Sequence, residues 1–386
     1  MRLEFDVAIL GGGAAGLMAA ARLNELGGLS VCVIEGNEKS AAKIRISGGG
    51  KCNLTNVSVS EQNYLGDETL VREVLERFDE AALLAWVRAH GCKPVVRKER
   101  YYFCPHSAQE LIDILLKEAA ATKFFLQHSV LKVEKADGLF TVTTDKKVIK
   151  ARKVIVATGG ISYASVGASG IGLEIAETFG IATVPFRPAL AGLTLQKAQF
   201  WMKALTGVSF PVAIRVGERT LQEDMLFAHR GISGPAVLSA SLYWEKGAIT
   251  IDFLNGVPLA SLLKKGGNRK ISTALPLPKR FVTAFLEQAG VADKPCSALR
   301  AEEVAQLVGL EAYTFAPAGT FGFTKAEVSK GGVACSGLKA PSCESVRVNG
   351  LYFVGEVTEV TGELGGYNFQ WAFASGRCAA EDIATV

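Results

Sequence analysis

The sequence predicts an α/β protein of the Rossmann-like class, in which a dinucleotide-binding domain is interrupted by an insertion. Three observations carry this prediction. The apolar run Phe5–Leu10, of the kind that forms buried parallel strands, precedes a glycine-rich turn, a helix-forming segment and a second apolar run at 30–34. The same succession of strand, glycine-rich loop and helix returns after Gly331. Between 190 and 331 the pattern changes to short β-like runs and a helical stretch.

Composition limits the class of protein. Of the 386 residues, 41 are glycine without a Gly-X-Y period, which excludes a collagen-like chain. The hydrophobic content of 49% and charged content of 21% are typical of a folded globular protein. The net charge of +4, from 42 basic and 38 acidic residues, gives no electrostatic argument for a nucleic-acid partner, so we expect none.

The cysteines and the apolar runs bear on metals and location. The eight cysteines form no C-x-x-C pair and the four histidines are scattered, so we expect no metal site. No apolar run approaches the ~18 residues that span a bilayer, and no signal peptide precedes the strand at Phe5. We therefore expect a cytoplasmic protein with reduced thiols and no membrane partner. The sequence leaves the oligomeric state open.

The first motif is the turn Gly11–Gly16, which reads G-x-G-x-x-G between a strand and a helix. Gly11 permits the tight turn, Gly13 lets a pyrophosphate approach the backbone, and Gly16 lets the helix pack closely. Glu35 follows at the end of the second strand, where an acidic residue accepts hydrogen bonds from the adenosine ribose. A chance glycine cluster is the alternative, and the strand and helix context argues against it. The motif does not separate FAD from NAD.

Residues 42–56 are polar and glycine-rich, so we expect a loop there. Gly48–Gly50 permit close backbone approach, and Lys43, Ser47, Asn53 and Thr55 supply donors. This composition suits a loop lying along the phosphate–ribityl part of a flavin dinucleotide. A flexible surface loop is the alternative.

Further elements follow from periodicity and turn signals. We expect a helix over Thr69–His90, a second helix after the capping box Ser107–Glu110, and strands over 124–134 and 139–149. The buried strand Val154–Ala157 runs into Thr158-Gly159-Gly160, a turn that we place beneath the cofactor, with an ordinary β-turn as the alternative. A short helix is expected over Gly172–Gly180.

The change of pattern near Pro185 sets the predicted domains. The cofactor domain is expected over 1–189 and 332–386, a small β-barrel over 190–254 and 312–331, and a helical insert over 255–311. The basic loop Lys264–Lys270 lies in this insert, and we favour a solvated loop over a nucleic-acid contact.

The C-terminal motif identifies the dinucleotide. A strand ends at Gly355-Glu356, and Gly365-Gly366 opens a final helix from about Phe369. Glu356 would bind a ribityl hydroxyl, and the N-terminus of the helix would stabilise negative charge on reduced flavin. Together with the N-terminal turn, this arrangement favours FAD over NAD. No second G-x-G-x-x-G exists, so a nicotinamide reductant, if used, docks transiently near the flavin.

These motifs resemble the BaiN/RdsA-like family of bacterial NAD(P)/FAD-dependent oxidoreductases, which includes aminoacetone-oxidase-like members. The matching segments are GGGAAG (11–16), KIRISGGGKCNLTN (43–56), VIVATGGISY (154–163), HRGISGPAVL (229–238), KGGV (330–333) and LYFVGEV…GGYNFQWAFASG (351–376). The resemblance implies a two-dinucleotide-binding-domain FAD flavoprotein fold with an inserted small β-barrel and a helical subdomain. It also implies likeness to the flavoprotein subunits of succinate dehydrogenase and fumarate reductase.

Four residues are candidates for catalysis. His229 could protonate a substrate and Arg230 could clamp a carboxylate, although a turn that only joins domains is the favoured alternative. Tyr367 and Asn368 begin the flavin-facing helix and could touch substrate. Cys52 has no second cysteine near it in sequence, so we expect a buried structural thiol rather than a redox-active one.

We therefore expect an FAD-dependent oxidoreductase acting on a small organic substrate, with NAD(P)H as the reductant to test first. The alternatives are an FAD-dependent RNA-modifying enzyme and a flavin-binding protein without turnover. The expected cofactor-binding residues are Gly11, Gly13, Ala14, Ala15, Gly16, Glu35, Lys43, Ser47, Gly48, Gly49, Gly50, Cys52, Asn53, Val130, Ala157, Thr158, Gly159, Gly160, Gly355, Glu356, Gly365, Gly366, Tyr367 and Asn368.

Overall fold

The chain divides into two compact units in the computed structural model, which describes residues 3–163 and 167–385. Unit 1 comprises Met1–Arg187 and Val328–Val386, and unit 2 comprises Pro188–Glu327. Among the described residues, no helix combines the length and the apolar character needed to cross a membrane.

A parallel sheet forms the centre of unit 1. Its strands run in the order β22 (Leu351–Phe353), β10 (Val148–Val156), β1 (Leu3–Leu10), β2 (Val31–Glu35) and β7 (Lys123–Leu126). Antiparallel strands β20 (Leu338–Lys339) and β21 (Glu344–Ser345) extend one edge, and the hairpin β8 (Val130–Ala136)–β9 (Leu139–Thr144) pairs with the first half of β10. Because the central strands are parallel, their carboxyl ends meet at one edge of the sheet.

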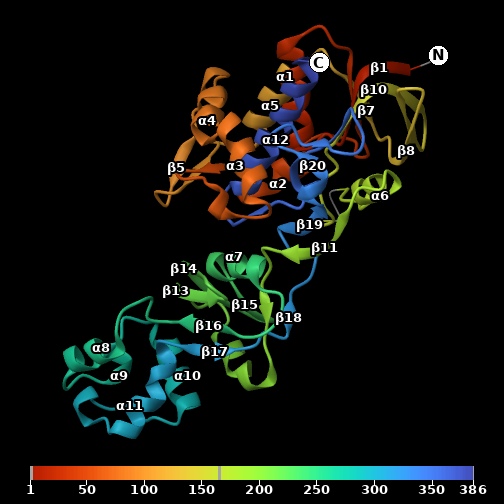
Figure 1. The fold of residues 1–386 in the computed structure, drawn as a ribbon. Helices are drawn as coiled ribbons and strands as arrows, with labels where there is room; N and C mark the ends of the chain where they lie inside the picture. The colour runs from red at the N-terminus through yellow and green to blue at the C-terminus, as the bar shows by residue number, and fades with distance from the viewer. Residues whose placement is uncertain (1–2, 164–166, 386) are drawn as a thin grey trace. The chain divides into compact units, whose positions relative to one another are not determined.

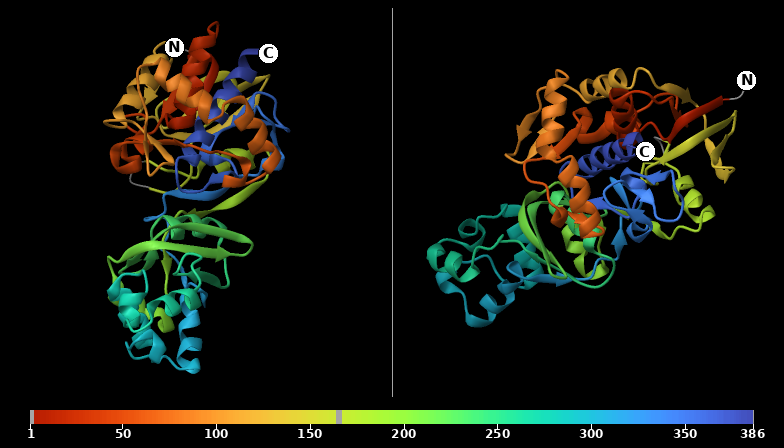
Figure 2. Two further views of the ribbon diagram at one scale, coloured as in Figure 1. Left: turned by 90° about the vertical axis from the view of Figure 1, so that its left-hand side faces the viewer. Right: turned by 45° about the horizontal axis from the view of Figure 1, so that its top comes forward.

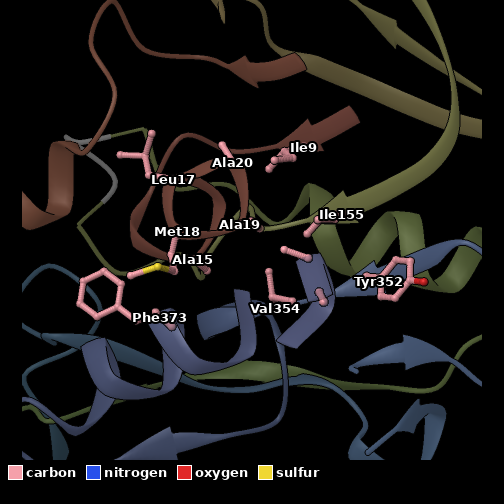
Figure 3. Packing of buried hydrophobic residues seen from close by; sticks show 14 of the residues in the cluster. Ile9, Ala15, Leu17, Met18, Ala19, Ala20, Ile155, Tyr352, Val354 and Phe373 are labelled. Carbon is pink, nitrogen blue, oxygen red and sulfur yellow. The ribbon is translucent and has the colours of Figure 1, made fainter. Parts of the chain in front are cut away.

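Helices α1 (Ala14–Leu26) and α12 (Tyr367–Thr385) lie side by side in unit 1, as the red and blue helices in Figures 1 and 2 show. Their backbones approach closely, because a Cβ at Gly376 would lie 2.3 Å from the carbonyl oxygen of Ala15. Leu17, Met18 and Phe373 fill the core beside them and are fully or almost fully buried (Figure 3). The two ends of the chain therefore build one core.

Shorter elements complete unit 1. The remaining helices are α2 (Ala42–Gly50), α3 (Glu68–Arg77), α4 (Glu80–Ala89), α5 (Gln109–Glu118) and α6 (Ile171–Thr178). Strand β6 (Tyr101–Phe103) pairs with β3 (Asn53–Asn56) and β5 (Val95–Arg97), β4 (Tyr64–Leu65) pairs with β23 (Thr361–Gly362), and β11 (Thr183–Ala189) pairs with β19 (Val328–Val333).

Four predicted elements of unit 1 were wrong in detail. The strand expected over 139–149 is β9 followed by the start of β10, which pair with each other. Residues 42–56 are not a loop, because they form α2 and β3, although Gly48 and Gly49 leave helical geometry with φ of +55° and +66°. The helix expected over Thr69–His90 is two helices, since Asp79 accepts a hydrogen bond from the Ala82 N–H and begins α4. The strand expected over 124–134 splits into β7 and β8 at Gln127, whose φ is +56°.

Unit 2 is built on an antiparallel sheet of seven strands. Their order is β17 (Tyr313–Phe315), β16 (Ile249–Asp252), β13 (Ser209–Val216), β14 (Arg219–Ala228), β15 (Gly231–Ser233), β12 (Leu193–Thr194) and β18 (Gly319–Thr320). The unit also contains α7 (Pro235–Tyr243) and a group of helices, α8 (Leu259–Gly266), α9 (Ile271–Ala274), α10 (Lys279–Ala289) and α11 (Ala301–Leu307) (Figure 1). Phe281 packs against Phe210, Phe227 and Phe253 in its core. The division of this region into a barrel and a helical insert stays a prediction.

Candidate functional site

The turn after β1 is shaped by contacts that only glycine permits. A Cβ at Gly11 would lie 2.4 Å from the Ala157 carbonyl oxygen, and one at Gly16 would lie 2.0 Å from the Gly11 carbonyl oxygen. Packing therefore explains both glycines. Gly13 is different, because a Cβ there would meet nothing within 4 Å and its φ of −83° suits any residue. The space above Gly13 is open at the N-terminus of α1.

The N-terminus of α1 has no side-chain cap. The first N–H groups of a helix lack partners within the helix and, with the helix dipole, favour an anion such as a phosphate. No acidic residue lies in the first turn of α1 to supply that negative charge. Open space and uncapped donors together make this turn suitable for a phosphate group.

Glu35 lies at the end of β2 and is fixed in orientation. Its Oε2 accepts a hydrogen bond from the Gly12 N–H at 2.8 Å. Its Oε1 accepts from the backbone N–H and the side-chain amide of Asn37, both at 2.8 Å. Since an ionised carboxylate offers about four acceptor positions, Glu35 retains acceptor capacity on Oε2 for a hydroxyl group.

Three buried hydroxyl groups of unit 1 have no protein partner, and two of them lie beside the turn after β1. They belong to Ser40, Thr55 and Thr158, and the described residues contain only two other such side-chain atoms, on His128 and Gln370. Ser40 Oγ would lie 2.7 Å from a Cβ at Gly12, and Thr158 follows Ala157. Buried polar atoms in native proteins almost always have partners. The hydroxyl groups of Ser40 and Thr158 therefore fit a bound polar molecule that supplies hydrogen bonds at this turn, whereas Thr55 lies beside Gly366.

An ion pair joins α2 to the loop after β22. Lys43 Nζ lies 2.5 Å from Glu356 Oε2, and both side chains are half-buried. Glu356 Oε1 accepts a hydrogen bond from the Ser329 N–H at 2.9 Å. A Cβ at Gly160 would lie 2.7 Å from Glu356 Oε1, so glycine at 160 makes room for this carboxylate.

Ser329 is a site residue that the sequence analysis missed. Its buried Oγ accepts hydrogen bonds from the N–H groups of Ile161 at 3.0 Å and Ser162 at 3.1 Å, and it contacts Ser162 Oγ at 3.0 Å. It thereby holds the turn that follows Gly160. The only signal in the sequence was its position directly before the 330–333 segment of the family resemblance.

The turn Gly365-Gly366 packs on the small sheet β3–β6–β5. A Cβ at Gly366 would lie 2.7 Å from the Cα of Thr55, and Asn56 donates a side-chain hydrogen bond to the Gly365 carbonyl at 3.1 Å. The predicted loop residues Ser47, Gly48, Gly49, Gly50 and Asn53 lie at the end of α2 and the start of β3. The structure therefore brings the 42–56 segment and the C-terminal motif together.

Two of the predicted cofactor residues, Val130 and Cys52, lie on strand β8 and directly before strand β3, respectively. Val130 begins β8, is half-buried and pairs with Thr144. The segment before it contacts the end of β2, where the His128 N–H donates a hydrogen bond to the Glu35 carbonyl at 2.9 Å. Cys52 is buried beside Cys104, because the pairing of β3 with β6 sets Asn53 opposite Phe103. The hydrogen bond to Cys52, together with burial, raises the pKa of the Cys104 thiol to about 12, and the hydrogen bond to Cys92 opposes this shift. Cys52 thus has thiol neighbours in space, although none is near in sequence.

The candidates for catalysis separate between the units. Tyr367 and Asn368 begin α12 in unit 1, whereas His229 and Arg230 lie between β14 and β15 in unit 2.

Burial raises the pKa of Tyr367 to about 12, so its phenol is protonated at neutral pH. The Asn368 amide exchanges hydrogen bonds with the backbone of Gly362 at 2.8 and 2.9 Å, and it therefore holds the loop before α12. The guanidinium of Arg230 lies over the ring of Phe321.

Known proteins resemble this chain over nearly its whole length. A family model described as the HI0933-like protein Rossmann domain matches residues 5–382. The ribosomal RNA dihydrouridine synthase of Escherichia coli K12 is 36% identical over 393 residues, with 98% of each chain covered. The 3-dehydro-bile acid delta(4,6)-reductase of Clostridium scindens is 31% identical over 407 residues, again with 98% of each chain covered.

Among solved structures, a chain of the Mycobacterium smegmatis Sdh1 complex in the apo form has a TM-score of 0.53 and 16% identity, covering 100% of this chain and 68% of that chain. This likeness concerns the fold.

The expectation that no nucleic acid is involved is corrected, because a relative that matches over 98% of its length is named for ribosomal RNA. The total charge on which that expectation rested is a weak guide to a local surface. The predicted Rossmann-like class and family resemblance are confirmed, and the chain belongs to the HI0933-like Rossmann-domain family.

Proposed function

We propose that the protein is an FAD-dependent oxidoreductase that reduces uridine in ribosomal RNA to dihydrouridine, with NAD(P)H as the electron source. The observation that carries the RNA substrate is the 36% identity, over 98% of both chains, with a relative named ribosomal RNA dihydrouridine synthase. A ribosomal RNA substrate implies that the protein acts in the cytoplasm.

The unit 1 site supports FAD as the cofactor. The uncapped N-terminus of α1 and the open space at Gly13 suit the pyrophosphate, and Glu35 has acceptor capacity for a ribose hydroxyl. The Lys43–Glu356 pair and the unpartnered hydroxyls of Ser40 and Thr158 provide further polar contacts. When bound, FAD supplies hydride transfer, and the protein supplies binding, orientation and electrostatics.

The reaction adds two hydrogen atoms across the C5–C6 double bond of uracil. In balance, NAD(P)H, one proton and uridine give NAD(P)⁺ and dihydrouridine, so a hydride and a proton must both reach the base. Tyr367 is our proposed proton donor, because its phenol carries a proton and it is the first residue of α12, the helix whose N-terminus we expect to face the flavin. Asn368 would position the start of α12 through its hydrogen bonds to Gly362. His229 and Arg230 remain proposed substrate contacts from unit 2.

A second candidate is reduction of a conjugated steroid ketone. It is favoured by the 31% identity with a 3-dehydro-bile acid delta(4,6)-reductase, which also matches over 98% of both chains. The two candidate reactions share one chemistry, since each saturates a carbon–carbon double bond conjugated with a carbonyl group. They differ in the size and charge of the substrate.

The test compares both substrates on one preparation. Purified protein reconstituted with FAD is first reduced anaerobically with NADH and with NADPH, and flavin absorbance is followed. The reduced protein is then given unmodified ribosomal RNA transcript or a 3-oxo-Δ4,6 steroid. Nucleosides and steroids are quantified by mass spectrometry. We expect dihydrouridine in the RNA and no reduced steroid.

The matched control is Tyr367→Phe, which keeps the ring packing and removes the phenol. We expect this variant to bind FAD and to be reduced normally, with slower formation of dihydrouridine. Steroid reduction without dihydrouridine would replace the RNA proposal with the second candidate. A protein that holds no FAD would overturn both.

A further inference from the structure

The net charge of the chain is distributed unequally between the two units. Unit 1 contains 27 Lys and Arg against 27 Asp and Glu, which balance to zero. Unit 2 contains 15 Lys and Arg against 11 Asp and Glu, which gives +4. The whole net charge of +4 is therefore located on unit 2.

Within unit 2 the positive charge is concentrated in one stretch of sequence. Residues 253–286 contain no Asp or Glu and six basic residues. All six side chains are exposed, and we call them the basic segment: Lys264, Lys265, Arg269, Lys270, Lys279 and Arg280. Long runs of sequence without an acidic residue let positive potential add up instead of cancelling between neighbours.

The fold keeps these residues close together. Lys264 and Lys265 lie in the last turn of α8, and the Arg269 guanidinium donates a hydrogen bond to the Lys265 carbonyl at 3.3 Å. Lys270 and Lys279 both interact electrostatically with the carboxylate of Asp293. The Asp293 carboxylate is already held by the N–H and hydroxyl of Ser272. Lys270 and Lys279 thus share one carboxylate that is already hydrogen-bonded to Ser272.

The chemistry of the basic segment suits phosphate groups. The described side chains from 264 to 280 include no exposed large apolar residue, since Leu263, Ile271 and Leu275 point into the core of unit 2. A membrane-binding helix exposes an apolar face to the bilayer, and this surface has none. The segment from 264 to 280 also has no aromatic residue to stack on bases. Lysine and arginine without aromatic partners contact the nucleic-acid backbone and carry no base specificity.

We propose that the basic segment of unit 2 is the surface on which the RNA substrate docks, through its phosphate backbone and without regard to sequence. This inference rests on the proposed function, because it takes RNA as the substrate. It assigns RNA affinity to unit 2 and the choice of the reacting base to other contacts.

The experiment measures binding by the FAD-loaded protein to two fluorescent RNA hairpins of equal length and unrelated sequence, over a range of salt concentrations. The variant K264Q/K265Q/K270Q removes three charges and keeps the Arg269 hydrogen bond. We expect its affinity at low salt to fall about tenfold or more for both hairpins. We expect the slope of log K against log salt to become shallower by about 2 to 3, since each phosphate contact contributes ~0.7 to ~0.9.

The matched control is K117Q/K123Q/K132Q, which removes three exposed lysines from unit 1. We expect its salt slope to equal that of the wild type. Equal losses in both triple variants, or a wild-type slope in the unit 2 variant, overturn the docking surface while leaving uridine reduction untouched. Binding to phosphatidylglycerol vesicles but not to RNA also overturns it. If RNA binding follows our expectation and no dihydrouridine forms, the proposed reaction fails and the docking surface stands.

Discussion

The two units use their residues in opposite ways. At the candidate site of unit 1, side chains are absent where backbone segments meet, as at Gly11 and Gly16, and charged groups are paired, as in Lys43 with Glu356. In unit 2 the notable residues are six exposed cations without acidic neighbours in the sequence. Unit 1 therefore offers fixed backbone and charged groups to one molecule, and unit 2 offers a surface of positive charge. Averaging the charge over the chain hides the second property.

The largest effect is expected from substitutions of two glycines in the turn after β1. They test whether each glycine is needed for packing within the protein or for space beside a ligand. In Gly16→Ala the new Cβ would lie 2.0 Å from the Gly11 carbonyl oxygen, so we expect a loss of about 3 kcal/mol or more in the free energy of unfolding. In Gly13→Ala the Cβ meets no protein atom, so the free energy of unfolding should stay the same or rise by about 0.5 kcal/mol.

Flavin content and thermal melting distinguish the two glycines. We expect Gly13→Ala to fold normally and to bind FAD weakly, because the methyl group occupies the space that the pyrophosphate needs. Normal FAD affinity in Gly13→Ala would contradict the assignment of this space to the cofactor.

The next effect concerns the hydrogen bonds of Ser329. Ser329→Ala leaves the buried N–H groups of Ile161 and Ser162 without an acceptor, which should cost about 2 kcal/mol in the free energy of unfolding. The control is Ser209→Ala in unit 2, whose hydroxyl only donates to the Met225 carbonyl; its cost should be about 1 kcal/mol or less. Urea denaturation measures both. Equal costs would mean that Ser329 does not hold the turn after Gly160.

Alkaline pH should destabilise unit 1 first. Seven of the eight cysteines lie in unit 1, and burial raises the pKa of Cys32 to about 12 and that of Cys378 to about 12 from the ordinary value of 9.0. The unfolded chain loses these protons above pH 9 while the folded chain keeps them, so stability is full below pH 9 and falls as the pH rises toward 12.

We expect a loss of about 1 kcal/mol per such thiol by pH 10. Urea denaturation at pH 8 and pH 10 measures this loss. The variant Cys32→Ala should show a smaller difference between the two pH values than the wild type. Proteolysis at pH 10 that cuts unit 2 before unit 1 would contradict the assignment to unit 1.

The smallest effect on stability is expected at the turn after β14. Arg230→Ala removes the contact of the guanidinium with the Phe321 ring, which should cost about 0.5 kcal/mol. Stability therefore does not interfere with a test of function. Slower turnover with an unchanged melting temperature would support the proposed role of Arg230 toward the substrate. Unchanged turnover would leave the turn with no role beyond the fold.

Local features of the site could be predicted from sequence, and distant pairings could not. The positions of Gly11, Gly13 and Glu35 could be predicted, because a single strand–turn–helix–strand unit determines their geometry. The Lys43–Glu356 contact joins residues 313 positions apart, and nothing in either local pattern specifies the other. The helical start of α2 was missed because Gly48–Gly50 dominate the composition of that segment. Ser329 was missed because a serine in a strand gives no signal until its acceptor role is seen.

The packing of α1 against α12 joins two segments that the ribosome synthesises at different times. The turn after β1 is synthesised before unit 2, and β22 and α12 are synthesised after unit 2. Domains generally fold as they emerge, so unit 2 can be complete while β10 still lacks its neighbour β22. At that stage Lys43 also lacks its ion-pair partner, Glu356. A ligand that needs both Lys43 and the start of α12 can therefore bind only after β22 and α12 have been synthesised.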